Sequence, residues 1–151
     1  MRASVVLAAL VLAASQQSNA NSSAQKIGAR DVYPRLSNYR GEVTVAVGKL
    51  NPLLGDVLLF ARKGGARIWI YSEQNSAGVA LYRKLARAGA FVFACPLELK
   101  NSGVLAFDDL VVSGVLVDLG SALSVGVRSK SLSLQTRQKM GALGAKCTRV
   151  S

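Results

Sequence analysis

The chain has 151 residues, enough for one domain with a hydrophobic core of its own. Half of the residues are hydrophobic and 18% are charged, a composition that excludes an intrinsically disordered chain. With 19 Lys and Arg against 8 Asp and Glu, the formal net charge is +11, which points to polyanionic partners such as nucleic acid, anionic lipid headgroups or acidic proteins.

The first twenty residues have the pattern of a secretory signal peptide. Arg2 precedes an apolar run over residues 5–14, and the small residues Ser18 and Ala20 flank Asn19 before a cleavage point after Ala20. The apolar run is too short to span a bilayer. We therefore expect a signal peptide over residues 1–20, a periplasmic or secreted protein, and no stable membrane span after cleavage. An uncleaved membrane anchor is the alternative.

Residues 21–40 are polar with little periodicity, so we expect a linker there and a single domain over residues 41–151. The alternating valines of residues 42–47 then predict a strand. The stretch "NPLLGDVLLFARKGG" predicts a helix, because Asn51 can cap it, Pro52 suits its first position and Gly64 suits its C-terminal cap.

The order of elements beyond this helix predicts an α/β sandwich. Uniformly apolar strands are expected where helices cover both faces of a sheet, so we expect a mixed, mostly parallel sheet flanked by helices. The expected elements are strands over residues 66–71 and 90–95, a helix over 77–88, strands over 104–107 and 110–119 joined by a turn at Asp108-Asp109, a strand over 131–134, and a helix over 135–143.

The chain contains no histidine, which removes the usual general base, the usual partner of a serine or cysteine nucleophile, and a common metal ligand. No Walker loop or Gly-x-Gly-x-x-Gly motif is present, and no cofactor is implied. Asp108 and Asp109 are neighbours, and adjacent strand residues point to opposite faces, so even with Asp118 they are poor candidates for a metal or acid–base site. We expect no metal site.

The two cysteines, Cys95 and Cys147, can form one disulfide in the oxidising compartment that export implies. Such a bridge would tie the C-terminal segment to the strand that ends at Cys95. Two buried thiols are the alternative.

The phrases "GARIWIY", "LYRKLARAGAFVFACPL" and "AFDDLVVSGVLVDLGSALS", in this order, resemble the phospholipase D superfamily. The likeness covers about residues 42–124 and is greatest to the small, secreted, single-motif branch of bacterial endonucleases. The family motif is His-x-Lys, four residues, Asp, six residues, Gly-Ser-x-Asn. The resemblance implies a phospholipase D-like α/β fold with that motif on two strands joined by a turn.

Laid on this sequence, the Gly-Ser of the motif falls on Gly120 and Ser121, whereas the catalytic positions are degenerate. In the family, a histidine attacks phosphorus, a second histidine from a symmetric partner protonates the leaving oxygen, and the lysine stabilises the nonbridging oxygens. The positions of the histidine, lysine, aspartate and asparagine fall on Ala106, Asp108, Ser113 and Leu123. An aspartate at the lysine position would repel a phosphodiester.

The sequence thus favours an exported, catalytically inactive phospholipase D-like protein that binds DNA or another polyanion, or acts as an assembly module. By association with the nucleases it resembles, a DNA-transfer or secretion system is its expected setting, and a homodimer through the motif edge is expected. The alternatives are an active phosphodiesterase or endonuclease using unrecognised residues, and a purely structural secreted protein. No acidic residue follows Asp118, and the expected nucleic-acid-binding residues are Arg128, Lys130, Arg137, Lys139, Lys146 and Arg149.

Overall fold

The structure of the protein, a computed structural model, describes residues 25–73, 79–96, 98–99, 102–114 and 124–150. The strands are β1 (Gln25–Lys26), β2 (Glu42–Val47), β3 (Arg67–Glu73), β4 (Phe91–Cys95), β5 (Gly103–Phe107), β6 (Leu110–Gly114), β7 (Ser124–Arg128) and β8 (Thr148–Val150). The helices are α2 (Ala29–Asn38), α3 (Pro52–Lys63), α4 (Val79–Arg87) and α5 (Lys130–Leu143), which runs into the short 3-10 helix η2 (Gly144–Lys146).

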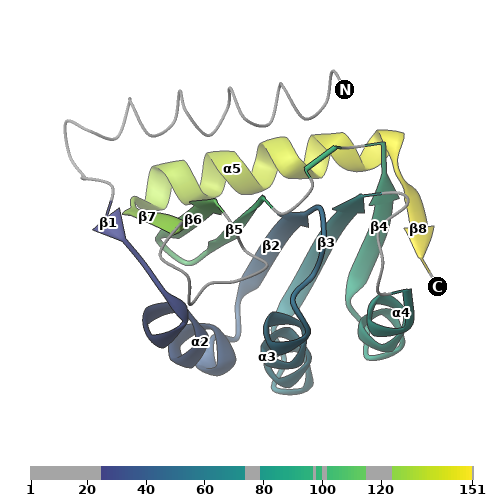
Figure 1. Ribbon diagram of the computed structural model, residues 1–151, viewed down its shortest axis with the longest axis horizontal. Helices are drawn as coiled ribbons and strands as arrows, with labels where there is room; N and C mark the ends of the chain where they lie inside the picture. The colour runs from purple at the N-terminus through teal and green to yellow at the C-terminus, as the bar shows by residue number, and fades with distance from the viewer. Residues whose placement is uncertain (1–24, 74–78, 97, 100–101, 115–123, 151) are drawn as a thin grey trace.

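The described strands form one eight-stranded sheet in the order β1-β7-β6-β5-β2-β3-β4-β8. Helices α2, α3 and α4 cover one face of this sheet, and α5 crosses the other (Figure 1). We call these the α2–α4 face and the α5 face. The domain is therefore a three-layer α/β sandwich, as the sequence predicts.

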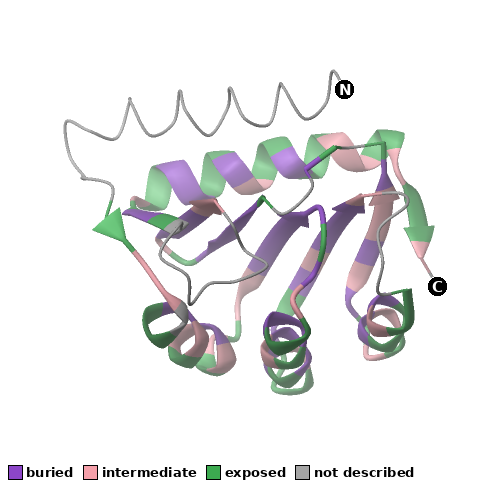
Figure 2. Ribbon diagram, viewed as in Figure 1, coloured by how far each residue is buried: buried purple, intermediate pink, exposed green. Residues whose placement is uncertain are grey.

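Buried residues lie along the strands of the sheet (Figure 2), and alternation along each strand divides them between two apolar clusters, one on each face. On the α2–α4 face, residues such as Val45, Ile70 and Leu105 belong to the larger buried cluster. On the α5 face, Ala46 and Ala106 pack with Met140 of α5 in a second cluster. Because both faces of the central strands are buried, these strands carry apolar residues on both faces.

Helix α3 begins and ends where its sequence predicts. The Asn51 side chain accepts a hydrogen bond from the backbone N–H of Leu53 at 2.7 Å, and Pro52 occupies the first helical position. Gly64 caps the C-terminus, and Gly65 after it takes a φ of 113°, a conformation that favours glycine. These caps direct the chain from α3 into β3.

The sheet is mixed, as expected, but it is not mostly parallel. Among the described strands, only β2–β3 and β3–β4 pair in parallel, whereas the pairings that involve β1, β5, β6, β7 and β8 are antiparallel. The β5–β6 hairpin and strand β7 extend the sheet on one side, and β8 returns antiparallel on the other. The apolar strands reflect coverage by helices on both faces and do not require parallel pairing.

Part of the expected linker belongs to the domain. The described portion of residues 21–40 contains β1 and α2, and Val32 and Leu36 of α2 are fully buried in the core. The helix contains Pro34, and its outer face is strongly polar. For these two reasons the helical spacing of its apolar residues was not evident from the sequence. The expected signal peptide lies outside the described residues.

The strand expected over residues 131–134 is wrong, because helix α5 already begins at Lys130. Ser129 caps it by accepting a hydrogen bond from the backbone N–H of Leu132 at 3.2 Å. The alternation of serine and leucine over these residues is typical of a strand with one buried face. In the structure, both leucines belong to α5, where Leu132 is buried and Leu134 is half-exposed. The expected strand over 110–119 is described as far as Gly114.

Among the described residues, no helix combines the length and the apolar character that crossing a bilayer requires.

Candidate polyanion-binding surface

The structure describes three of the positions that the resemblance assigns to the catalytic motif, and these three are not gathered into one open site. Ala106 lies on β5, and its side chain is fully buried on the α5 face against Met140 and its neighbours. Ser113 lies on β6 opposite Val104, so it shares this face and is half-buried. Asp108 is set apart in the turn at the end of the hairpin. Gly120, Ser121 and Leu123 lie outside the described residues.

Both turn aspartates contact the same side chain. Arg35 of α2 places its Nη2 atom 2.8 Å from Asp109 Oδ1 and 3.2 Å from Asp108 Oδ2. The expectation that adjacent aspartates diverge fails here, because both lie in a turn and not in a strand. Asp108 takes a φ of 53°, which aspartate tolerates better than most residues.

The hydrogen bond from Arg35 lowers the pKa of Asp109 and raises the pKa of Arg35 itself. The cluster thus joins α2 to the hairpin, and the single charge of Arg35 offsets only part of the charge of the two carboxylates. Asp118 lies outside the described residues, and within the described part of the chain no three His, Cys, Asp or Glu side chains could hold a metal ion.

Five of the six expected nucleic-acid-binding residues lie on elements of the α5 layer or point to the α5 face. Lys130, Arg137 and Lys139 belong to α5, Lys146 to η2, and Arg149 to β8, where its guanidinium lies 5.2 Å from the centroid of the Phe91 ring. No acidic residue occurs between residues 124 and 150. We call this set the α5 basic surface. Its three lysines are exposed.

Arg128 does not belong to this surface. It follows Val127, which is buried on the α5 face, so its side chain points to the other face of the sheet. There its charge helps to lower the pKa of Asp109, after the larger effect of Arg35.

The edge of the α5 basic surface holds one carboxylate between two arginines. Glu42, at the start of β2, lies 3.3 Å from Arg67 and 3.6 Å from Arg137, measured between carboxylate oxygen and guanidinium nitrogen. Arg137 also donates from Nε to the carbonyl oxygen of Ser133 at 3.3 Å. These contacts hold Arg137 against the sheet.

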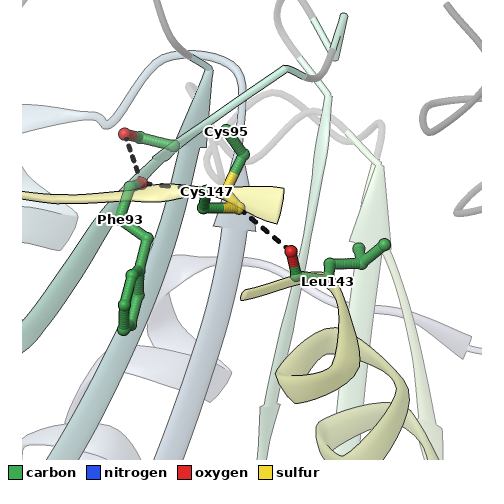
Figure 3. The surroundings of a disulfide bond; sticks show 5 residues. Phe93, Cys95, Leu143 and Cys147 are labelled. Carbon is green, nitrogen blue, oxygen red and sulfur yellow. Dashed lines mark hydrogen bonds between the residues drawn. A yellow bond between two sulfur atoms is a disulfide. The ribbon is translucent and has the colours of Figure 1, made fainter. Parts of the chain in front are cut away.

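The two cysteines form the disulfide Cys95–Cys147, which joins the end of β4 to the segment after η2 (Figure 3). Cys147 Sγ also lies 3.2 Å from the carbonyl oxygen of Leu143, the last residue of α5. The bridge therefore anchors the C-terminal end of α5 and strand β8 to the sheet, as the sequence predicts.

Arg35 and Glu42 were not found from the sequence. Arg35 lies 73 and 74 residues before its two partners, and a single arginine in a polar segment carries no signal of such a contact. In the sequence, Glu42 is the polar first residue of a predicted strand, and nothing there indicates its contacts with two arginines.

No protein-family model matches the sequence, and no curated protein matches it. Solved structures do match. Nuc from Salmonella typhimurium, a phospholipase D family member, superposes with a TM-score of 0.67 at 13% identity, over 86% of this chain and 99% of that one. NucT from Helicobacter pylori gives 0.66 at 11% identity, over 86% of this chain and 100% of that one.

A third match is TrmBL2, an archaeal chromatin protein described as showing a novel mode of DNA binding. It superposes with a TM-score of 0.58 at 16% identity, over 85% of this chain and 54% of that one. At such identities the likeness establishes the fold alone. The chain is thus a single α/β domain with the phospholipase D-like fold of Nuc.

Proposed function

We propose that this protein is an exported, noncatalytic member of the phospholipase D-like fold class that binds DNA or a similar polyanion. One observation carries the proposal: a chain with the fold of Nuc has 19 basic residues against 8 acidic ones and no histidine. The charge favours a polyanionic partner, and the composition removes the nucleophile that the resemblance implies.

The structure supports the noncatalytic part of the proposal at Ala106. Alanine has no nucleophile, and its side chain is fully buried beneath α5. Asp108 points its carboxylate to Arg35, at the end of the hairpin, where it adds negative charge instead of the positive charge that a phosphodiester needs.

The α5 basic surface supports the binding part. It presents Lys130, Lys139 and Lys146 to solvent with no acidic residue on α5, η2 or β8. The structural likeness to a chromatin protein described as showing a mode of DNA binding fits a role in DNA binding. A DNA-transfer or secretion apparatus is the setting that we infer.

Export is supported by the disulfide, since such bonds persist in oxidising compartments such as the periplasm. The pattern of residues 1–20 is the second support. A secreted or periplasmic form that begins at Asn21 in mass spectrometry is the expected result, and an intact Met1 would contradict export by cleavage.

The test of the proposed function is a salt titration of binding to a labelled DNA fragment. Binding through phosphate contacts gives a logarithmic affinity that falls with the logarithm of salt concentration by about 0.9 per contact. We expect a steep linear fall for the native chain. Replacing Lys130, Lys139 and Lys146 with Gln should reduce the slope by about 2 to 3.

The chain offers a matched control for charge. Arg83, Lys84 and Arg87 are exposed on α4, on the opposite face of the sheet, and replacing these three with Gln removes the same charge. This variant should keep most of the native slope. Equal losses in the two variants would reject the α5 basic surface as the contact region. Failure of the native chain to bind DNA at low salt would reject the function.

A further inference from the structure

Two aromatic pairs stack on the α5 face near the α5 basic surface. The ring centroids of Trp69 and Phe91 lie 5.2 Å apart with 21° between the planes, and those of Tyr71 and Phe93 lie 5.3 Å apart at 10°. The Arg149 guanidinium lies 5.2 Å from the centroid of Phe91. Strands β3, β4 and β8 therefore carry one continuous stack of Trp69, Phe91 and Arg149.

The other side of the Trp69 indole faces a groove. The residue opposite Trp69 on β2 is Thr44, whose short side chain leaves space over the sheet. A cavity of about 170 Å³ lies there, lined from the sheet by Glu42, Thr44, Trp69 and Tyr71 and from α5 by Leu134, Arg137, Gln138 and Gly141. Leu134 is 49% exposed and Gln138 is also exposed, so the groove opens to solvent along the helix.

Two guanidinium groups and one carboxylate border this groove, so its local charge is positive by one. Arg137 lines it, and Arg67 is held near it by the shared contact with Glu42. The side chain of Arg67 is 66% exposed and that of Arg137 is 18% exposed, so an anion reaches Arg67 from solvent and Arg137 from the groove that it lines. A phosphate offers the same acceptor oxygens to guanidinium groups as the carboxylate of Glu42 does.

We propose that this groove binds one unstacked base of a single-stranded nucleic acid against the indole of Trp69. The base stacks on the side of the ring that Phe91 does not cover, and the flanking phosphates pair with Arg67 and Arg137. In a duplex, neighbouring bases cover both faces of each base, so a duplex cannot use the groove in this way. The inference rests on the proposed function and names the form of nucleic acid that the site takes.

Trp69 is the only tryptophan in the chain, so its fluorescence reports on the groove directly. The experiment titrates the disulfide-bonded full-length protein with three probes. These are a single-stranded oligothymidylate of about twelve nucleotides, a duplex of equal length, and heparin, a polyanion without bases. We expect the oligothymidylate to quench the fluorescence, and the duplex and heparin to bind with little change.

Two variants separate stacking from charge. Trp69→Leu should bind the single-stranded probe roughly tenfold more weakly, as judged by the anisotropy of a labelled probe, because it loses the stacking surface. Its affinity for heparin should not change. Trp69→Phe keeps an aromatic face and should lose less. Phe60→Leu removes a ring that is 60% exposed on α3, on the other side of the sheet, and should leave all three affinities unchanged.

The outcomes distinguish this inference from the proposed function. If heparin and DNA bind while Trp69 fluorescence stays constant and Trp69→Leu binds like the native chain, the base-binding groove is rejected and the polyanion-binding function stands. If none of the three probes binds the native protein, the proposed function fails as well. Equal quenching by heparin would also overturn base stacking.

Discussion

Arg35 connects α2 to the β5–β6 hairpin through a single guanidinium nitrogen that contacts two carboxylates. The guanidinium also lies 5.7 Å from the centroid of the Phe107 ring, which packs 5.5 Å from the ring of Tyr39. Charge and aromatic contacts thus meet at the end of the sheet that the resemblance marks for catalysis. These contacts join α2 to the hairpin.

Asp109→Asn should destabilise the domain by about 1 kcal/mol at neutral pH. The contact with Arg35 lowers the pKa of Asp109, so the stabilisation is present above the unfolded pKa of about 3.9 and is lost as the pH falls through the folded pKa. Urea unfolding at pH 7 and at about pH 2 checks this. The native and variant curves should converge in acid, and Asp56→Asn, at an exposed position on α3, should show no effect. A difference that persists in acid would contradict the ion pair as its source.

Ala106→His should destabilise the domain by about 2 to 3 kcal/mol and produce no phosphodiesterase activity. The side chain is fully buried between the sheet and α5, so an imidazole must displace packed neighbours and bury a polar ring. Thermal unfolding measures the loss. Ser113→Asp, at a half-buried position on the same face, serves as the comparison and should cost less. Unchanged stability in Ala106→His would show that the position is open.

At the scale of elements, helix α2 is part of the folded core. Leu36→Ala should cost about 2 to 5 kcal/mol, because the deleted side chain is fully buried beside α3 and the sheet. Arg30→Ala, at an exposed position on the same helix, should be nearly neutral. Chemical denaturation gives both values. If Leu36→Ala left the free energy of unfolding unchanged, α2 would not be part of the folded core, and the segment would be the linker that its polarity suggests.

The disulfide secures α5, η2 and β8, the elements that carry the basic surface. It closes a separation of 52 residues, for which loop entropy alone gives about 4 kcal/mol. Replacing both Cys95 and Cys147 with Ser should lower the free energy of unfolding by about 2 to 4 kcal/mol. Hydrogen exchange should then increase first in β8. Unaltered exchange in β8 would contradict the anchoring role.

The elements that the sequence predicted correctly are those with local signals. Helix α3 carries its caps at Asn51 and Gly64, and strands β2 to β6 are runs of apolar residues bounded by turns. The short strands β1 and β8 have no such pattern, and each pairs with a strand distant in the sequence. Strand β7 pairs with the preceding strand β6, and its alternating Val125 and Val127 were a missed signal. For α5, the capping serine at position 129 was the missed signal.

The candidate site was predictable only in part, for the same reason. Every charged residue after Asp118 is basic, and this pattern predicted most of the α5 basic surface. The contacts of Arg35 and Glu42 depend on tertiary structure, and so does the groove beside Trp69. The alternation of Trp69 with Tyr71, and of Phe91 with Phe93, is a local signal that could have indicated an aromatic face.

At the scale of the whole molecule, the sheet restricts how two copies can associate. Strand β6 pairs with both β5 and β7, so residues 110–114 offer no free edge for the expected homodimer. A dimer through this stretch requires a contact by side chains or residues beyond Gly114. The homodimer remains a prediction, and light scattering at micromolar concentration checks it.

The central claim, that the fold binds nucleic acid without cleaving it, is tested most directly by the integrity of bound DNA. End-labelled single-stranded DNA is incubated with excess protein at low salt, and one sample is analysed both as the native complex and after denaturation. We expect a shifted complex whose DNA is entirely intact, because the chain has no histidine to attack phosphorus. Cleavage products that co-purify with the protein, and that disappear in an otherwise identical unfolded sample, would contradict the account.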